Sequence, residues 1–258
     1  MIPKIIHYCW FGNGEKTSLV NKCISSWEQY CPDYEIIEWN ENNFDVTCCE
    51  FVSSAYKERK WAFVADYVRL YALVNYGGIY MDTDVEVCKN LDAFLDNVAF
   101  SGFQTIDTIP TGIMACEKDY HVFKKLLNDY NDRNFYNENG EPELITNVVH
   151  ITNEYKKYGV VLTNTKQTVA GLTLFPVDYF CAKSDETGII SITENTHTIH
   201  HFAGSWLNKQ EIQKRKGVYF IFKHFGVLAP IVAFFYKGFF YYLFRPGNII
   251  KKLRGEKH

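Results

Sequence analysis

The sequence of 258 residues lacks several patterns that would place it in a well-defined class of protein. Its eight cysteines include no Cys-x-x-Cys pair, so we predict neither a zinc site nor a disulfide framework, and we expect reduced thiols in a cytoplasmic compartment. The opening Met-Ile-Pro-Lys leads straight into a predicted strand, so no signal peptide is expected. A formal net charge of −3 leaves no excess of positive charge for a nucleic-acid partner.

Long apolar runs are also missing, since none reaches the roughly 20 residues that a membrane-spanning helix needs. The longest candidate, 218–244, is interrupted by two lysines and a proline and is flanked by basic residues. Aromatic stretches with basic flanks favour a helix or helical hairpin in the interface of an anionic membrane, and the alternative is a pair of core helices packed on a sheet. We therefore predict one domain over 1–210 and a basic, aromatic-rich helical tail over 211–258 that associates with a membrane surface.

The remaining chain has the composition and order of an α/β domain. Hydrophobic residues make up 47% of the sequence and aromatic residues 17%, which is enough for a sizeable core. A strand over 2–10, a helix over 18–30 and a strand over 35–39 form the pattern that begins a parallel nucleotide-binding sheet. At this length, one α/β domain is the expected architecture.

The stretch 79–87 reads as an apolar strand that contains two carboxylates, Asp82 and Asp84. Period-two alternation predicts that Tyr80 and Glu86 share their side of the strand. Two acids at this spacing repel each other and lose solvation when buried, so a positive charge must offset them. Hard oxygen ligands suit Mg²⁺ or Mn²⁺. The alternative is an aspartate pair that caps a turn at the end of a strand.

A helix over 61–76 comes just before this strand and is apolar nearly all round, which is typical of a buried helix. Asp66 and Arg69 lie three residues apart and therefore share a face. On a helix this apolar, we expect the pair to point into a cleft, although a simple helical ion pair is the alternative. Gly77 or Gly78 is expected to end the helix.

The motif that runs from Asp66 through Arg69 to Tyr80-Met-Asp82-Thr-Asp84 resembles the Asp-x-Asp sugar transferases of glycosyltransferase family 32. That family includes bacterial capsular and lipopolysaccharide transferases and yeast Golgi mannosyltransferases, and it is similar to the glucosylating domains of clostridial toxins. The resemblance implies a fold of the GT-A type, a Rossmann-like nucleotide-sugar-binding sheet flanked by helices. It also implies a metal-dependent, retaining hexosyltransferase with a preference for UDP-sugars.

With flanking matches at both ends, the resemblance covers about residues 1–206 and implies roles for individual residues. The expected catalytic residues are Asp66, Arg69, Asp82 and Asp84. The residues expected to bind the donor are Trp10, which would stack on the base, with Asp66, Arg69, Tyr80, Asp82, Ser205 and Trp206. The expected ligands of Mn²⁺ or Mg²⁺ are Asp82, Asp84 and His201, because imidazole suits Mn²⁺ beside carboxylates. The neighbouring His200 is expected to pack or to support the site.

The resemblance and the tail together imply a glycan or lipid-linked glycan acceptor in bacterial surface polysaccharide synthesis, at the inner face of the cell membrane. Two alternatives stay open. A phosphatase of the haloacid dehalogenase type would also place Asp82-x-Asp84 after an apolar strand, but the later acids Asp129 and Asp132 stand in the wrong context for its second acidic pair. A catalytically inert, membrane-associated sugar-binding protein would not need both acids of the motif.

Overall fold

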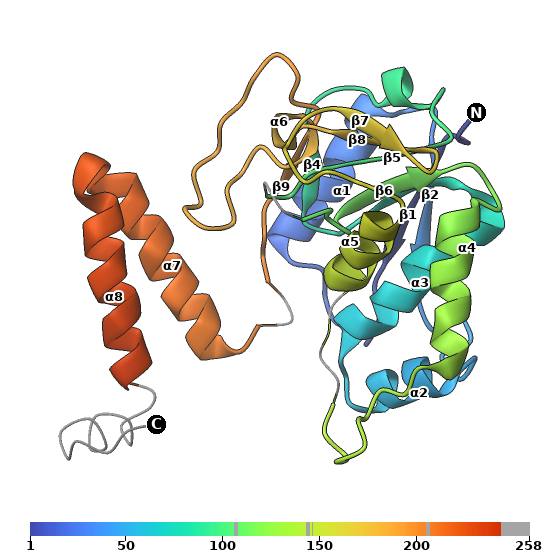
Figure 1. The fold of residues 1–258 in the computed structure, drawn as a ribbon, viewed down its shortest axis with the longest axis horizontal. Helices are drawn as coiled ribbons and strands as arrows, with labels where there is room; N and C mark the ends of the chain where they lie inside the picture. The colour runs from blue at the N-terminus through green and yellow to red at the C-terminus, as the bar shows by residue number, and fades with distance from the viewer. Residues whose placement is uncertain (106–107, 143–144, 146, 205–206, 244–258) are drawn as a thin grey trace. The chain divides into compact units, whose positions relative to one another are not determined.

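The computed structural model describes residues 1–105, 108–142, 145, 147–204 and 207–243 (Figure 1). The chain divides into two compact units, Met1–Ala182 with Ser191–Trp206 and Lys183–Ile190 with Leu207–His258. The second unit thus includes a loop that the predicted boundary at residue 210 leaves in the first domain.

Nine strands and six α-helices of the described chain build the first unit. In chain order they are β1 (Ile5–Cys9), α1 (Ser18–Tyr30), β2 (Glu35–Trp39), α2 (Glu50–Lys57), α3 (Trp61–Tyr76), β3 (Gly78–Met81), β4 (Val85–Val87), β5 (Ala99–Gly102), β6 (Ile113–Cys116), α4 (His121–Asn128), α5 (Asn147–Lys157), β7 (Gln167–Val169), β8 (Leu172–Phe175), α6 (Val177–Phe180) and β9 (Thr198–His200). Seven strands form a mixed sheet in the order β2-β1-β3-β6-β5-β8-β7, and β4 pairs with β9. The predicted α/β fold, a sheet flanked by helices, is confirmed.

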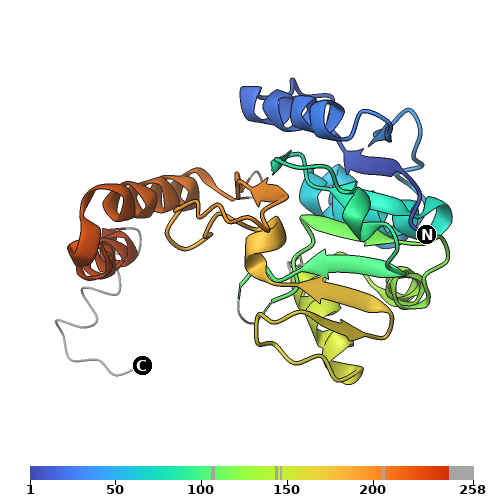
Figure 2. The same cartoon turned by 90° about the horizontal axis from the view of Figure 1, so that it is seen from above.

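The order of the first three strands creates a switch point in the sheet. From β1 the chain passes through α1 to β2 on one side, and then through α2 and α3 to β3 on the other side, and both strands run parallel to β1 (Figure 2). In open α/β sheets, ligands bind beyond the carboxyl ends of strands at such a point. Trp10 directly follows β1 and Asp82 directly follows β3, so both stand at this edge.

The predicted single strand over 79–87 is wrong, because the chain turns at the two acids. The strand β3 ends at Met81, and Val85 N donates to the carbonyl of Asp82 at 3.0 Å before β4 begins. The strand β4 then pairs antiparallel with β9 and is not part of the seven-stranded sheet. A turn suits the acids because continuing the large sheet would bury both carboxylates among its apolar layers.

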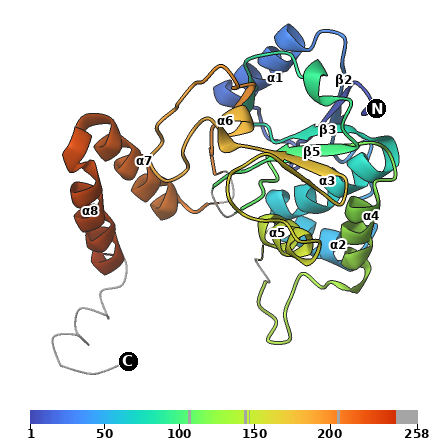
Figure 3. The ribbon, with the colours of Figure 1, turned by 45° about the horizontal axis from the view of Figure 1, so that its top comes forward.

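Helices cover both faces of the sheet (Figure 3). On one face a core joins residues of α2, α3, α4 and α5, and on the other face a core joins residues of α1 and α6. Alternation along β3 sends Tyr80 into the first core, while Ile79 and Met81 enter the second. The tyrosine therefore points toward α3, the buried helix that was predicted over 61–76 and that the structure confirms.

A buried histidine fixes the middle of β1. His7 is fully buried, its Nε2 lies 2.8 Å from the carbonyl oxygen of Gly77, and Trp39 Nε1 donates to its Nδ1 at 3.2 Å. These partners select the neutral tautomer with the proton on Nε2. Burial lowers the pKa of His7 to about 4, although the bond to Gly77 opposes this shift.

The pKa of His7 predicts acid-sensitive stability. The unfolded chain takes up a proton near pH 6.5 and the folded chain only near pH 4, so the stabilisation is complete above pH 6.5 and lost as the pH falls to 4. The loss amounts to about 3 kcal/mol in the free energy of unfolding. Urea denaturation at several pH values should show a smaller loss over this range for His7→Gln than for the unmodified chain. An equal loss in both proteins would contradict the prediction.

The second unit contains a helical hairpin. The helices α7 (Lys209–His224) and α8 (Ala229–Leu243) are joined by a 3-10 turn, η3 (Gly226–Leu228). Asn208 and Glu211 form a capping box that starts α7. Among the helices that the structure describes, none is both long and apolar enough to cross a bilayer.

Candidate active site

The buried side chain of Arg69, from the middle of α3, organises the first half of the site. Its Nη2 lies 3.2 Å from Asp66 Oδ1 and 3.4 Å from Asp82 Oδ1. Its Nη1 donates to the carbonyl of Thr111 at 2.8 Å, and the guanidinium stands 4.7 Å above the ring of Tyr80. One buried cation thus joins two carboxylates that would otherwise repel each other.

The carboxylate of Asp82 is held from several sides. Tyr80 donates its hydroxyl to Asp82 Oδ1 at 3.0 Å, and the backbone N–H of Asp82 donates to the carbonyl of Gly112 at 2.8 Å. The tyrosine ring itself is buried. Tyr80 therefore supports the acid, and its predicted contact with the donor stays a prediction.

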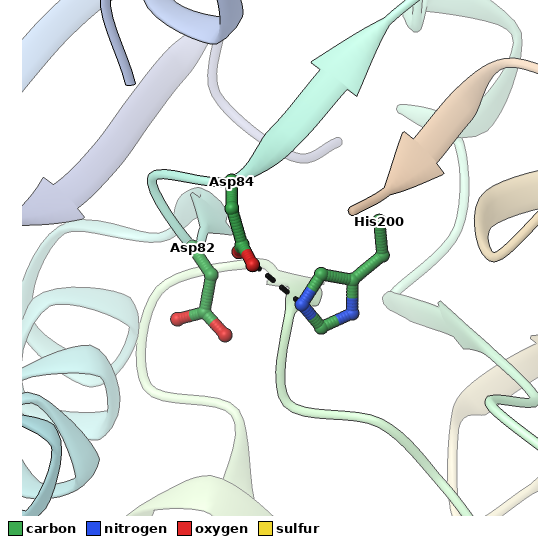
Figure 4. Close-up of side chains that lie close together, drawn as sticks. All are labelled: Asp82, Asp84 and His200. Atoms are coloured by element: carbon green, nitrogen blue, oxygen red, sulfur yellow. Dashed lines mark ion pairs between the residues drawn. The ribbon is translucent and has the colours of Figure 1, made fainter. Parts of the chain in front are cut away.

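Asp84 faces His200 in the second half of the site (Figure 4). Its Oδ1 lies 3.2 Å from His200 Nε2, and its Oδ2 accepts the backbone N–H of Ala203 at 2.7 Å. Burial alone would raise the pKa of Asp84, but the attraction of His200 and these hydrogen bonds lower it to about 2. Burial would lower the pKa of His200, and the charge of Asp84 raises it well above its usual value.

The donor set fits a divalent cation. Asp82, Asp84 and His200 each offer one ligand atom, and these atoms all lie within 4.8 Å of one another. Two carboxylates and one imidazole suit Mn²⁺ better than Mg²⁺. The ring nitrogen of His200 that faces Asp84 is Nε2, and the ring also interacts with Cys181, which together with Asp84 raises the pKa of the imidazole.

The structure brings His200, and not His201, to the two aspartates. His201 Nε2 lies 2.8 Å from Glu86 Oε2, which also accepts from Lys22 Nζ at 2.7 Å. The His200 ring fits because Gly112 has no side chain, since a Cβ there would stand 2.7 Å from the His200 ring. The predicted metal role of His201 therefore does not match the geometry, and we assign that role to His200 as a proposal.

The two adjacent histidines can be separated by substitution. His200→Ala is expected to weaken Mn²⁺ binding by at least about 100-fold, the upper end of what the loss of a supporting partner costs at metal sites. His201→Ala is the matched control and should leave the affinity nearly unchanged, because its ring faces Glu86. Calorimetric titration with Mn²⁺ in the presence of a nucleoside diphosphate measures both. The reverse ranking would restore His201 as the ligand.

Asn147, at the start of α5, is a site residue that the sequence analysis did not predict. Its backbone N–H donates to Asp66 Oδ2 at 3.3 Å, and its Nδ2 donates to the carbonyl of Asp66 at 2.6 Å. Tyr130 in turn donates to Asn147 Oδ1 at 2.8 Å. Burial raises the pKa of Asp66 to about 6, although Arg69 and Asn147 oppose the shift. A single asparagine about 80 residues from Asp66 gives no sequence signal of this contact.

Among the three other predicted donor residues, the structure describes only Trp10. Trp10 is half-buried at the carboxyl end of β1, where its Nε1 donates to the carbonyl of Gly14 at 2.7 Å. Lys16 Nζ lies 5.7 Å from the centre of the same indole ring. Ser205 and Trp206 fall outside the described residues, so their predicted roles stay predictions.

The stretch that contains α3, Asp82 and Asp84 is similar to a known protein family. Residues 17–101 match the family described as "Glycosyltransferase sugar-binding region containing DXD motif". Inositol phosphoceramide mannosyltransferase 3 of Schizosaccharomyces pombe is 31% identical over 130 residues, which are 46% of this chain and 34% of the relative. The chain thus spans about a third of the length of that curated relative. The predicted family resemblance is confirmed for this region.

Some solved structures also show a partial similarity to this chain. PaToxG glycosyltransferase has a TM-score of 0.42 at 18% identity, over 49% of this chain and 58% of the other. The galactosyltransferase LgtC, solved with donor and acceptor sugar analogues, has a TM-score of 0.36 at 14% identity, over 68% and 74% of the two chains. At these values neither structure contributes to the assignment of residues.

Proposed function

We propose that this chain, whose residues 17–101 match a glycosyltransferase sugar-binding region with a DXD motif, is a metal-dependent hexosyltransferase that uses a nucleotide sugar. The observation that carries the proposal is the meeting of Asp82, Asp84 and His200 beyond the carboxyl end of β3. This meeting lies at the switch point of the sheet, where α/β folds bind nucleotides. Two carboxylates and an imidazole at that place can bind a divalent cation, and the cation can bind the diphosphate of the donor.

Asp82, Asp84 and His200 would have different roles at the diphosphate of the donor. Asp84 and His200 would hold the cation, and Asp82 would contact the ribose and share in metal binding. A bound divalent cation acts as a Lewis acid that stabilises negative charge on the departing nucleoside diphosphate. Ala203 N and Gly112 fix the acid and the imidazole in place, so the site is organised before the donor binds.

The buried pair on α3 would position the sugar. Asp66 is more accessible than Arg69, with 11% of its side chain exposed against 5%. We therefore propose that Asp66 accepts hydrogen bonds from sugar hydroxyls, while Arg69 holds Asp66 and Asp82 at a fixed separation. Fixed positions of this kind raise the rate because the reacting groups are already oriented.

The finer assignments follow from the family resemblance. Trp10 at the end of β1 would stack on the base, which favours a uridine nucleotide, and the reaction would retain the configuration of the donor sugar. The Schizosaccharomyces pombe relative is a mannosyltransferase by name, so GDP-mannose is the first donor to set against UDP-sugars. We propose as acceptor a glycan, free or lipid-linked, of bacterial surface polysaccharide at the inner face of the membrane.

A donor panel tests the proposal. The purified protein is incubated with Mn²⁺ and each of several UDP- and GDP-sugars, and the slow release of free nucleotide is measured. Release from one donor that stops with EDTA is expected. Where hydrolysis without acceptor is too slow, calorimetry measures the binding of donor and metal instead. The absence of both would overturn the proposal, and glycan binding without metal or donor would support the inert alternative. Release of phosphate from a sugar phosphate alone would support the phosphatase.

A further inference from the structure

The charge of the chain is divided between its two parts. Residues 209–258 contain 11 Lys and Arg and only two acids, whereas residues 1–208 contain 16 Lys and Arg and 28 acids. The small net charge of −3 is thus the sum of a basic segment, 209–258, and an acidic segment, 1–208. Basic segments of this strength are attracted to anionic surfaces and repel copies of themselves.

One face of α8 packs on α7. Ala229 and Ala233 are buried against Ile221 in a small apolar core. Gly217 lets the two helices approach, because a Cβ there would collide with the hydroxyl end of Tyr236. The two helices of the hairpin are therefore packed against each other on one side. The side chains on the other side are exposed although the helices are packed.

The opposite face of η3 and α8 is apolar and open to solvent. Val227 is 94% exposed, Phe234 74% and Phe235 69%. The exposed apolar residues on this face are Val227, Leu228, Ile231, Phe234, Phe235 and Phe239. Their spacing of one, three and four residues places them in one helical stripe. A contiguous apolar stripe of this kind marks an interaction site.

Lysines border the same surface on α7. Lys209, Lys216 and Lys223 are exposed and recur every seven residues, so they lie along one side of the helix. Phe220 stands between the last two and is 57% exposed. It also lines an apolar groove of about 540 Å³, together with Phe235 and other residues of both helices. The basic row therefore adjoins the apolar stripe.

We propose that the α7–α8 hairpin binds the surface of an anionic bilayer, with the apolar stripe of η3 and α8 inserted among the acyl chains and the lysine row of α7 at the headgroups. Lysine side chains can bury their methylene stems and keep the charged ends at the phosphate level. A second copy of the chain is a poorer occupant, because its hairpin would bring the same positive charge. The inference specifies the membrane partner in the proposed function, but binding to lipid does not require transfer activity.

Flotation of the full-length protein with lipid vesicles tests this docking. Vesicles of phosphatidylcholine mixed with phosphatidylglycerol are compared with pure phosphatidylcholine, because anionic lipids attract basic segments. We expect binding to the anionic vesicles alone. The double change Phe234→Ser and Phe235→Ser should reduce it by about tenfold or more. The same change at the exposed Val161 and Ile192 of the first unit is the matched control and should have no effect.

Charge reversal tests the second half of the docking surface. Lys216→Glu with Lys223→Glu should abolish binding to anionic vesicles, whereas Lys118→Glu with Lys156→Glu, two exposed lysines of the first unit, should not. Equal binding to both vesicle types, or binding that survives the phenylalanine changes, would overturn the proposal. So would dimerisation through the hairpin without vesicle binding, seen by light scattering. Donor hydrolysis measured without lipid should be unchanged in all these variants, so failure here is distinct from failure of the proposed transfer.

Discussion

Replacement of Asp84 by asparagine is expected to lower metal-dependent nucleotide release by about 100- to 1,000-fold, the cost of removing one electrostatic contact to a transition state. The amide keeps the size of the side chain but loses the charge that faces His200 and that would bind the proposed cation. Release should be measured with the preferred donor over a series of Mn²⁺ concentrations. Calorimetry should show metal affinity reduced in parallel.

The control for this change is Asp96→Asn, because Asp96 is an exposed acid of the same unit. It should release nucleotide at the unmodified rate. Thermal denaturation of both variants distinguishes loss of the site from loss of the fold. An Asp84→Asn protein that stays folded and retains its rate and its Mn²⁺ dependence would remove Asp84 from the metal site.

Substitution of Arg69 by methionine is expected to be the most destabilising change at the site. The side chain is 5% exposed and pairs with both Asp66 and Asp82. Removing it leaves at least one buried carboxylate without a cation, which costs about 3–5 kcal/mol in the free energy of unfolding. Urea denaturation at pH 7 measures this loss.

The substitution Arg69→Lys distinguishes the effect of the positive charge from the effect of the planar guanidinium group. Lysine keeps the positive charge but cannot reach Asp66, Asp82 and the carbonyl of Thr111 with one planar group. We therefore expect much of the stability to remain while nucleotide release falls by about 10- to 100-fold, because the two acids lose their fixed separation. The exposed Arg59→Lys is the matched control. Full activity in Arg69→Lys would show that a charge alone is sufficient at this position.

Local patterns in the sequence were enough to predict the frame of the site. The apolar residues nearly all round α3 and the glycines after it identified a buried helix that turns directly into the acidic stretch, and both features are observed. The juxtaposition of Asp66 and Arg69 also follows from helical spacing. These features depend on neighbours within a few residues, which is the range over which periodicity is informative.

Contacts between distant segments were decided only by the tertiary structure. Sequence adjacency treats His200 and His201 alike, but β4–β9 pairing and the missing side chain of Gly112 turn His200 to Asp84. In the same way, Asn147 reaches Asp66 only because α5 begins beside α3. The sequence by itself determined which acids and which helix belong to the site. Which imidazole and which amide complete it depends on the packing of strands and helices more than 80 residues apart, and no local period encodes that packing.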